Sequence, residues 1–237
     1  MKTVFIAGTD TDVGKTFITS SIAALLLKKG LHIGVIKWTG TGGDKSNPDI
    51  DYIVTQAAKA SFGPGSKLSV SCPYNFTFPA SPHLASAMEG KKIDPQRILE
   101  ATKQMEQTCD VVIIEGVGGL MVPLNQDILL IDLIRISGCP VILIARSGLG
   151  TINHTLLSLE ALRHRNIKVK AVVLNSISSE GQADTTSEEI VTDNKETIGK
   201  IARLPVFGPV PFDRNPLSEA VFGFVDPVAQ IIVEDCA

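Results

Sequence analysis

Five short apolar runs, rich in β-branched residues, recur along the chain between segments with helical periodicity. Their continuous apolar character, without alternating polar residues, is typical of strands buried on both faces of a parallel sheet. Helices between such strands form right-handed crossovers. We therefore predict an α/β fold: a doubly wound, mainly parallel sheet with helices on both faces. The runs cover residues 3–7, 33–37, 111–114, 141–144 and 169–174.

Helical patterns occupy most of the intervals between these runs, whereas two segments lack a clear pattern. The predicted helices cover residues of about 15–29, 51–60, 94–108, 127–137, 152–165 and 186–200. Residues 39–50 and 176–187 are rich in Gly, Ser, Thr and Asp, and we predict that both are loops. No repeat or linker divides the chain, so residues 1–237 are expected to form a single domain.

Charge and composition exclude several classes of protein. With 22 Lys and Arg against 25 Asp and Glu, the net charge of -3 lacks the basic excess of a nucleic-acid binder, so any anion site must be local. No apolar stretch reaches the length of about 18 residues that a membrane helix needs. Residues 1–7 are too few for a signal-peptide core. We expect a cytoplasmic protein with no nucleic-acid or membrane partner.

The cysteines agree with this interpretation. All four lie far apart in the sequence, and no two form a CxxC pair. Such spacing argues against a zinc or disulfide framework and favours reduced, mostly buried thiols. The residues are Cys72, Cys109, Cys139 and Cys236.

A phosphate-binding loop follows the first predicted strand. Residues 8–16 read GTDTDVGKT, and a helical pattern begins directly after them. Backbone N–H groups of such a loop and the helix N-terminus point at phosphate oxygens. Lys15 would reach the β- and γ-phosphates, and the Thr16 hydroxyl would ligate Mg²⁺. Gly8 stands one residue earlier than in the common G-x-x-x-x-G-K-[ST] spacing, but the strand–loop–helix context is complete.

Two charged residues end other predicted strands, at the sheet edge where ligands of such folds gather. Glu115 follows the run 111–114, and its carboxylate there can hold Mg²⁺ opposite Thr16. Lys37 ends the second run, where a compact cation can stabilise charge on a transferred phosphoryl group. A capping acid and an ordinary strand-end lysine are the structural alternatives.

Further motifs are spread over the chain. They are Lys37, PASPH at 79–83, EGVGG at 115–119, GLGTINH at 148–154, VVLN at 172–175 and PVP at 209–211. Together with residues 8–16, these blocks resemble the dethiobiotin synthetase family, the ATP-dependent cyclising ligases of biotin biosynthesis. The resemblance extends from residue 3 to about residue 216, and the phosphate loop and GLGTINH are its most specific parts.

The resemblance implies a reaction. One amine of 7,8-diaminononanoate takes up CO2 as a carbamate, and a carbamate oxygen attacks the γ-phosphate of ATP. The second amine then closes the cyclic urea of dethiobiotin, which releases phosphate and leaves ADP. The implied cofactors are ATP and Mg²⁺, the partners are small molecules, and the assembly is a homodimer.

The resemblance also implies a role for individual residues. Thr11, Lys15 and Lys37 would be catalytic, next to the carbamate and the transferred phosphoryl group. Mg²⁺ would be held by Thr16, Asp51 and Glu115, with Asp49 as the alternative to Asp51. The nucleotide contacts would be Asp12, Val13, Gly14, Lys15, Thr16, Phe17, Asp51, Glu115, Gly116, Val117, Gly118, Asn175, Ser176, Val210, Pro211 and Phe212. The substrate contacts would be Thr41, Ser81, Gly150, Thr151, Ile152 and Asn153, the last four at a helix start that binds the tail carboxylate across the dimer interface.

One departure from the family pattern keeps other functions open. Trp38, the only tryptophan, stands where the family usually has Pro, and it either packs beneath the next loop or changes which diamine fits. One alternative is a related P-loop ligase acting on another amine or carboxylate. A second is an ATP switch of the partitioning-ATPase type, although residues 8–10 lack the early lysine of that class. A non-catalytic regulatory domain is disfavoured by the retained Lys15 and Lys37.

Overall fold

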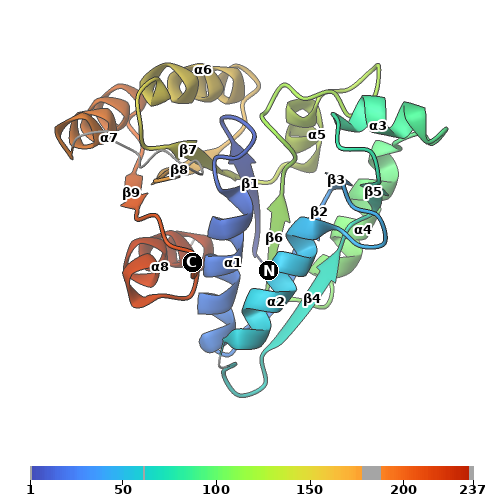
Figure 1. Cartoon of the computed structure of the whole chain (residues 1–237), viewed down its shortest axis with the longest axis horizontal. Helices are drawn as coiled ribbons and strands as arrows, with labels where there is room; N and C mark the ends of the chain where they lie inside the picture. Colours follow the sequence, from blue (N-terminus) through green and yellow to red (C-terminus); the bar gives the residue numbers. More distant parts are fainter. Residues whose placement is uncertain (1, 61, 178–187, 235–237) are drawn as a thin grey trace.

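A seven-stranded sheet, parallel at every strand pair, forms the centre of the molecule (Figure 1). The computed structural model describes residues 2–60, 62–177 and 188–234. The strands lie in the order β4-β2-β6-β1-β7-β8-β9, so that consecutive strands are connected by crossovers, as the sequence predicts. Their bounds are β1 Lys2–Gly8, β2 His32–Lys37, β4 Lys67–Ser71, β6 Val111–Glu115, β7 Val141–Arg146, β8 Val169–Asn175 and β9 Val206–Val210.

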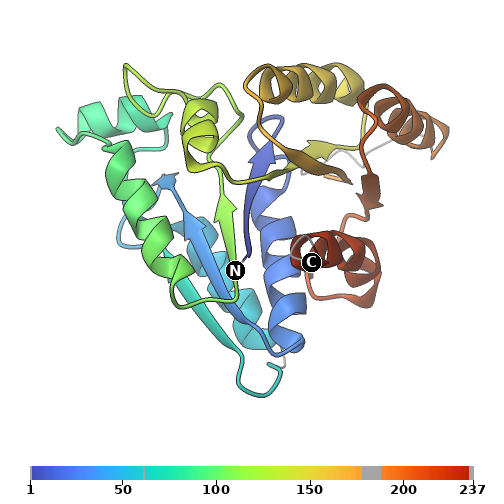
Figure 2. The ribbon, with the colours of Figure 1, turned by 180° about the vertical axis from the view of Figure 1, so that it is seen from behind.

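Helices cover both faces of this sheet (Figures 1 and 2). The core between sheet and helices consists of two apolar clusters, one on each face. One face is covered by α1 Lys15–Lys28, α2 Pro48–Lys59 and α8 Glu219–Glu234. The other is covered by α3 Pro82–Met88, α4 Pro95–Glu106, α5 Leu130–Ser137, α6 Thr151–His164 and α7 Glu188–Ala202. The predicted doubly wound α/β fold is therefore confirmed.

The central strands are buried as their composition indicates, whereas both edge strands escaped prediction. Every residue of β6 is buried. The edge strand β4 carries polar residues and is partly exposed, so it lacks the apolar run of a central strand. The opposite edge strand, β9, contains Gly208 and Pro209, residue types that are unfavourable in a strand interior. Helices α3 and α8 were also missed; α3 is short and α8 contains Pro227.

The predicted loop over residues 39–50 is wrong at both of its ends. Residues Thr39–Thr41 form β3, which pairs in parallel with β5, Tyr74–Phe76, in a separate two-stranded sheet. Helix α2 begins at Pro48, three residues before the predicted start at residue 51. The partner of β3 lies far along the chain, so local composition does not reveal the pairing. Of the second predicted loop, residues 178–187 lie outside the described residues.

Trp38 belongs to the core beneath this small sheet. Its ring is fully buried and meets the ring of Phe5 edge to face, with 4.8 Å between centroids. The indole Nε1 donates a hydrogen bond of 3.0 Å to Oγ1 of Thr102, on α4. Trp38 is thus a core residue, packed between β1 and α4.

Two further expectations concern the state of the cysteines and the absence of a membrane-spanning helix. Cys72, Cys109 and Cys139 carry free thiols, the first half-buried and the other two buried, and Cys236 lies outside the described residues. Within the part of the chain that the structure describes, every helix is too short or too polar to cross a membrane.

Candidate active site and nucleotide pocket

The carboxyl ends of three neighbouring strands bring the predicted charged residues together. In the sheet register, Glu115 of β6 lies beside Ile6 of β1 on one side and beside Lys37 of β2 on the other. Strand β1 continues into the phosphate loop and α1. Because parallel strands end at one edge of a sheet, residues distant in sequence meet there, as the switch-point rule predicts.

The phosphate loop connects β1 to α1 in a conformation that Gly14 makes possible. Gly14 is the N-cap of α1 and has φ 88°, and Asp12 also has a positive φ of 56°. A Cβ atom on Gly14 would lie 2.1 Å from Nδ2 of Asn175, so glycine is also required for the close approach. Nζ of Lys15 donates to the carbonyl of Asp10 at 2.9 Å. The N-cap of α1 has no side-chain cap, which leaves the helix start suited to an anion.

A buried group of charges lies beside the loop. Nζ of Lys37 is 2.6 Å from Oδ2 of Asp49 and 2.8 Å from Oε1 of Glu115. Oγ1 of Thr16 is 3.0 Å from Oδ1 of Asp49 and 2.8 Å from Oε1 of Glu115. Lys37 is 4% exposed and Glu115 is fully buried. Burying these charges is tolerable because each cation faces carboxylates.

The protonation of these groups follows from their neighbours. Burial, together with the positive charge of Lys37, lowers the pKa of Lys15 from 10.5 to about 8. Burial of Lys37 also opposes its ammonium form, but Glu115 and Asp49 outweigh that effect and raise the pKa of Lys37. Burial of Asp49 favours its protonated form, but Lys37 outweighs it and holds the pKa of Asp49 below its usual value. At neutral pH, Lys37 is therefore a fixed cation and Asp49 is an anion.

The oxygen atoms around Thr16 fit a divalent cation. Oε2 of buried Glu115 has no hydrogen-bond partner among the described residues, so this carboxylate is not saturated by the protein. A hydroxyl and two carboxylates are the hard oxygen donors that Mg²⁺ prefers. No group of three or more His, Cys, Asp or Glu side chains that could hold a metal occurs in the described ranges. An ion here would complete its coordination with phosphate oxygens and water.

Asp49, and not Asp51, reaches this set of oxygens. Asn47 is the N-cap of α2, so both aspartates lie in the first turn of the helix. Two residues apart on an α-helix, side chains diverge by about 200°. Asp51 is consequently exposed and accepts a hydrogen bond from the Ser46 hydroxyl. The geometry does not support Asp51 as a metal ligand, and Asp49 takes its place in the proposals below.

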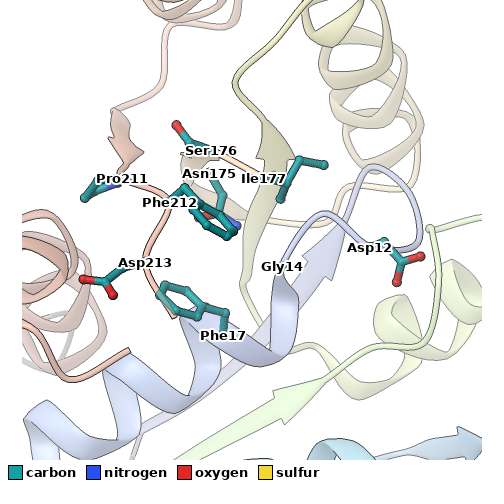
Figure 3. A pocket seen from close by; sticks show the side chains of 9 residues that line it. All are labelled: Asp12, Gly14, Phe17, Asn175, Ser176, Ile177, Pro211, Phe212 and Asp213. Carbon is teal, nitrogen blue, oxygen red and sulfur yellow. The ribbon is translucent and has the colours of Figure 1, made fainter. Parts of the chain in front are cut away.

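Two adjoining cavities lie along the phosphate loop. The first, of about 290 Å³, is lined by Thr11, Asp12, Gly14, Lys15, Thr16, Lys37, Thr41, Asp49, Val117 and Gly118. The second, of about 200 Å³ (Figure 3), is lined by Asp12, Gly14, Phe17, Asn175, Ser176, Ile177, Pro211, Phe212 and Asp213. Asp12 and Gly14 line both. An elongated ligand can therefore extend from one cavity into the other.

The second cavity is mainly apolar, with one oriented amide. Figure 3 shows Phe17 from α1, Asn175 from the end of β8 and Phe212 from the segment after β9. Asn175 is 4% exposed, and its Nδ2 donates to the carbonyl of Val13 at 3.1 Å. That bond fixes the amide, so its Oδ1 is the atom left to accept a hydrogen bond from a ligand.

Several residues singled out in the sequence line neither cavity. Ser81 is the N-cap of α3, and Gly150 is the N-cap of α6 with φ 86°, followed by Thr151, Ile152 and Asn153 in the first turn. Gly116 packs beneath the site, since a Cβ there would lie 3.0 Å from the Phe5 ring. Val210 is fully buried. Ile177 and Asp213 line the second cavity but were not predicted, although each directly follows a predicted residue.

Comparison with known proteins gives the family. A family profile described as "AAA domain" matches residues 2–219. An ATP-dependent dethiobiotin synthetase of Chlorobaculum tepidum is 38% identical over 212 residues, covering 87% of this chain and 83% of the relative. That of Bacillus subtilis (strain 168) is 33% identical over 229 residues, covering 95% and 94%.

Solved structures agree on the fold. The septum site-determining protein MinD of Pyrococcus horikoshii OT3, complexed with Mg-ADP, has a TM-score of 0.60 at 15% identity over 99% of this chain and 96% of that one. MinD of Pyrococcus furiosus has a TM-score of 0.59 at 16% identity, over 99% of each chain. At such low identities, the likeness to these structures shows a shared P-loop fold alone. The sequence relatives match at 33–38% identity over most of both chains, and this chain therefore belongs to the ATP-dependent dethiobiotin synthetase family.

Proposed function

We propose that this protein is an ATP-dependent cyclising ligase of biotin biosynthesis. It converts 7,8-diaminononanoate, CO2 and ATP into dethiobiotin, ADP and phosphate. The observation that carries the proposal is that Lys15, Lys37 and Asp49 line one cavity, beside a pocket of nucleobase size. Buried Glu115 contacts Lys37 directly behind this cavity lining. Membership of the dethiobiotin synthetase family supports this substrate over that of another P-loop ligase.

ATP would occupy both cavities, with its phosphates in the first and its adenine in the second. The start of α1 and the ammonium of Lys15, which border the first cavity, would bind the phosphates. The adenine would lie between Phe17 and the segment carrying Pro211 and Phe212. Oδ1 of Asn175 is oriented to accept a hydrogen bond from the exocyclic amine, since its Nδ2 is bound to Val13.

Thr16, Asp49 and Glu115 would hold Mg²⁺, through the oxygen atoms gathered around the Thr16 hydroxyl. When bound, the ion would neutralise charge on the phosphates and help to orient the transferred group. This assignment keeps two of the ligands expected from the sequence and replaces Asp51 by Asp49.

Lys37, which is paired with Asp49 and Glu115, would act on the reacting groups. The carbamate oxygen attacks the γ-phosphorus, the bond to ADP breaks, and the second amine then attacks the carbamate carbon and expels phosphate. Lys37 stays protonated, so it acts as a fixed positive charge towards these anions and not as a base. Thr11 lines the same space, and Thr41 lines it from β3, where they can orient the carbamate and the diamine.

The substrate's tail carboxylate would bind in a homodimer. The start of α6, residues 150–153, lies outside both cavities of its own chain. Leu149, just before this helix start, and Leu157, further along α6, are 82% and 62% exposed. Two copies packed through this segment would bury both leucines and offer the helix start to the partner's substrate. Ser81 would lie on the substrate side. Sedimentation of the wild type and of Leu157→Asp tests this, with a dimer expected only in the former.

Turnover with defined substrates tests the reaction. Purified protein with ATP, Mg²⁺, bicarbonate and 7,8-diaminononanoate should form dethiobiotin, detected by mass spectrometry, with one phosphate released per product. Omission of the diamine should abolish phosphate release. Release at the same rate without the diamine would indicate an ATPase or another ligase, and the proposal would then be abandoned.

A further inference from the structure

Asn47 uses both ends of its side-chain amide. The residue is 5% exposed and is the N-cap of α2: its Oδ1 accepts from the backbone N–H of Ile50 at 3.1 Å. Its Nδ2 donates in the other direction, to Oδ1 of Asn75 on β5, at 3.1 Å. One side chain therefore fixes the helix start and ties it to the small sheet.

Asn75 extends this connection to the segment that joins β3 to α2. In the β3–β5 register, Asn75 lies directly opposite Gly40. Its Nδ2 is 3.4 Å from the carbonyl oxygen of Gly43, to which it donates. The N–H of Gly43 in turn donates to the carbonyl of Phe76 at 3.2 Å. We call the pair Asn47 and Asn75 the amide clasp.

Two glycines make room for the amide clasp. A Cβ atom on Gly40 would lie 1.8 Å from Nδ2 of Asn47 and 2.9 Å from Oδ1 of Asn75. A Cβ atom on Gly43 would lie 3.1 Å from Nδ2 of Asn75, and 2.2 Å from the carbonyl oxygen of Ser46. Any side chain at either position would displace these groups, so the glycines of this segment, read as loop signals in the sequence, permit a close tertiary contact.

We infer that Asn47 and Asn75 are positioning residues for Asp49. Asp49 is the second residue of α2 after the N-cap Asn47, and its carboxylate reaches Lys37 and Thr16. Thr41, at the end of β3, lines the same cavity as Asp49. The amide clasp thus sets where the carboxylate of Asp49 stands relative to Thr16. The inference rests on the proposed function, because it concerns the Mg²⁺ ion that Asp49 would bind together with Thr16 and Glu115.

Substitutions can separate this role from simple support of the helix. Asn75→Ala removes the clasp but leaves the N-cap of α2 intact. Asn47→Ser keeps a capping oxygen and loses the donor that reaches β5. Asn75→Asp keeps the acceptor for Asn47. Asn125→Ala is the matched control, since that amide is also part-buried, donates to Ile93 O at 3.1 Å and accepts from two backbone N–H groups.

Binding of Mn²⁺ to the full-length protein with ADP, followed by electron paramagnetic resonance, reports on the ion directly. Asn75→Ala and Asn47→Ser should raise the Mn²⁺ dissociation constant about tenfold, the lower end of the effect of removing outer support from a metal ligand. The Mn²⁺ dissociation constant of Asn75→Asp should lie between the value of these two variants and that of the wild type. ADP affinity without a divalent ion should stay within about twofold in all variants.

Two results would overturn the inference. One is an unchanged Mn²⁺ dissociation constant in folded Asn75→Ala, with folding checked by circular dichroism. The other is an equal change in Asn125→Ala, which would show a general loss of stability. Because ADP and Mn²⁺ binding needs no diamine, the outcome is independent of dethiobiotin formation. If no dethiobiotin forms but the Mn²⁺ constant shifts as expected, the proposed reaction fails while the positioning role stands.

Discussion

The two cavities that meet at Gly14 are built on different physical principles. The first is formed around buried ionised groups, with Lys37 paired to Asp49 and Glu115. The second is formed by apolar side chains around one oriented amide, that of Asn175. Loss of one member of a buried ion pair leaves an uncompensated charge and costs far more than loss of one neutral hydrogen bond. We therefore expect substitutions in the first cavity to have the larger effects.

Lys37→Ala should give the largest effect. In the proposed mechanism this cation would face the transferred group, so its removal should lower turnover by about 10²–10³-fold, the range seen when a preorganised electrostatic group is lost. Affinity for ADP should remain within a few-fold, since the second cavity is untouched. Steady-state kinetics and fluorescence titration with a labelled ADP measure the two. Lys103→Ala, at an exposed position of α4, is the control. Retention of turnover in Lys37→Ala would contradict the assigned role.

Glu115→Gln should act mainly through the metal. The change keeps the shape of the side chain but removes its negative charge and replaces one carboxylate oxygen by an amide nitrogen, which cannot ligate a metal. The Mg²⁺ concentration for half-maximal turnover should rise about 10–100-fold. Glu106→Gln is a matched control, because that carboxylate accepts a hydrogen bond of 2.6 Å from Thr3 elsewhere in the fold. An unchanged Mg²⁺ requirement in Glu115→Gln would exclude Glu115 as a ligand.

Asn175→Ala should give a smaller and different effect in the second cavity. Loss of about 1–1.5 kcal/mol of hydrogen bonding should raise the KM for ATP about tenfold while kcat stays nearly constant. The preference for ATP over GTP should fall, since Oδ1 no longer selects an exocyclic amine. Kinetics with both nucleotides measure this. A large fall in kcat instead would show that the two cavities are not separable.

The smallest expected effect is a pH dependence of nucleotide affinity, and it should arise in the first cavity alone. Lys15 has its pKa lowered to about 8, so the protein loses this ammonium as the pH rises through 8. ADP affinity should then decline a few-fold between pH 7 and 9, whereas adenosine, which contacts the second cavity alone, should bind equally. Calorimetric titration at each pH provides both constants. An equal decline in adenosine affinity between pH 7 and 9 would contradict the assignment of the pH dependence to the first cavity alone.

The same pKa has an opposite consequence for folding. Between pH 8 and 10.5, the unfolded chain keeps the Lys15 proton that the native protein has lost. The unfolded state then binds more protons, so this residue makes the native state relatively more stable as the pH rises through that window. Denaturant titrations of the nucleotide-free protein can measure this contribution.

Prediction from sequence succeeded where the signal is local. The phosphate loop is recognisable because strand, glycines, Lys15 and helix follow one another directly. Glu115 and Lys37 could be placed because a charge that ends a buried apolar run must lie at the ligand edge of a parallel sheet. The edge strand β4 lacks such an apolar run, and β3 consists only of Thr and Gly. Neither segment can be recognised as a strand without the partner strand with which it pairs.

The sequence by itself thus determined the α/β class, the family and the phosphate loop, since periodicity and short motifs act over a few neighbouring residues. Which of Asp49 and Asp51 contacts Thr16 and Lys37 was decided by tertiary structure, because it depends on the direction in which the first turn of α2 faces. The hydrogen bond between Asn47 and Asn75 likewise depends on the tertiary structure. A side-chain hydrogen bond across 28 residues has no local pattern and exists only when the two segments pack together.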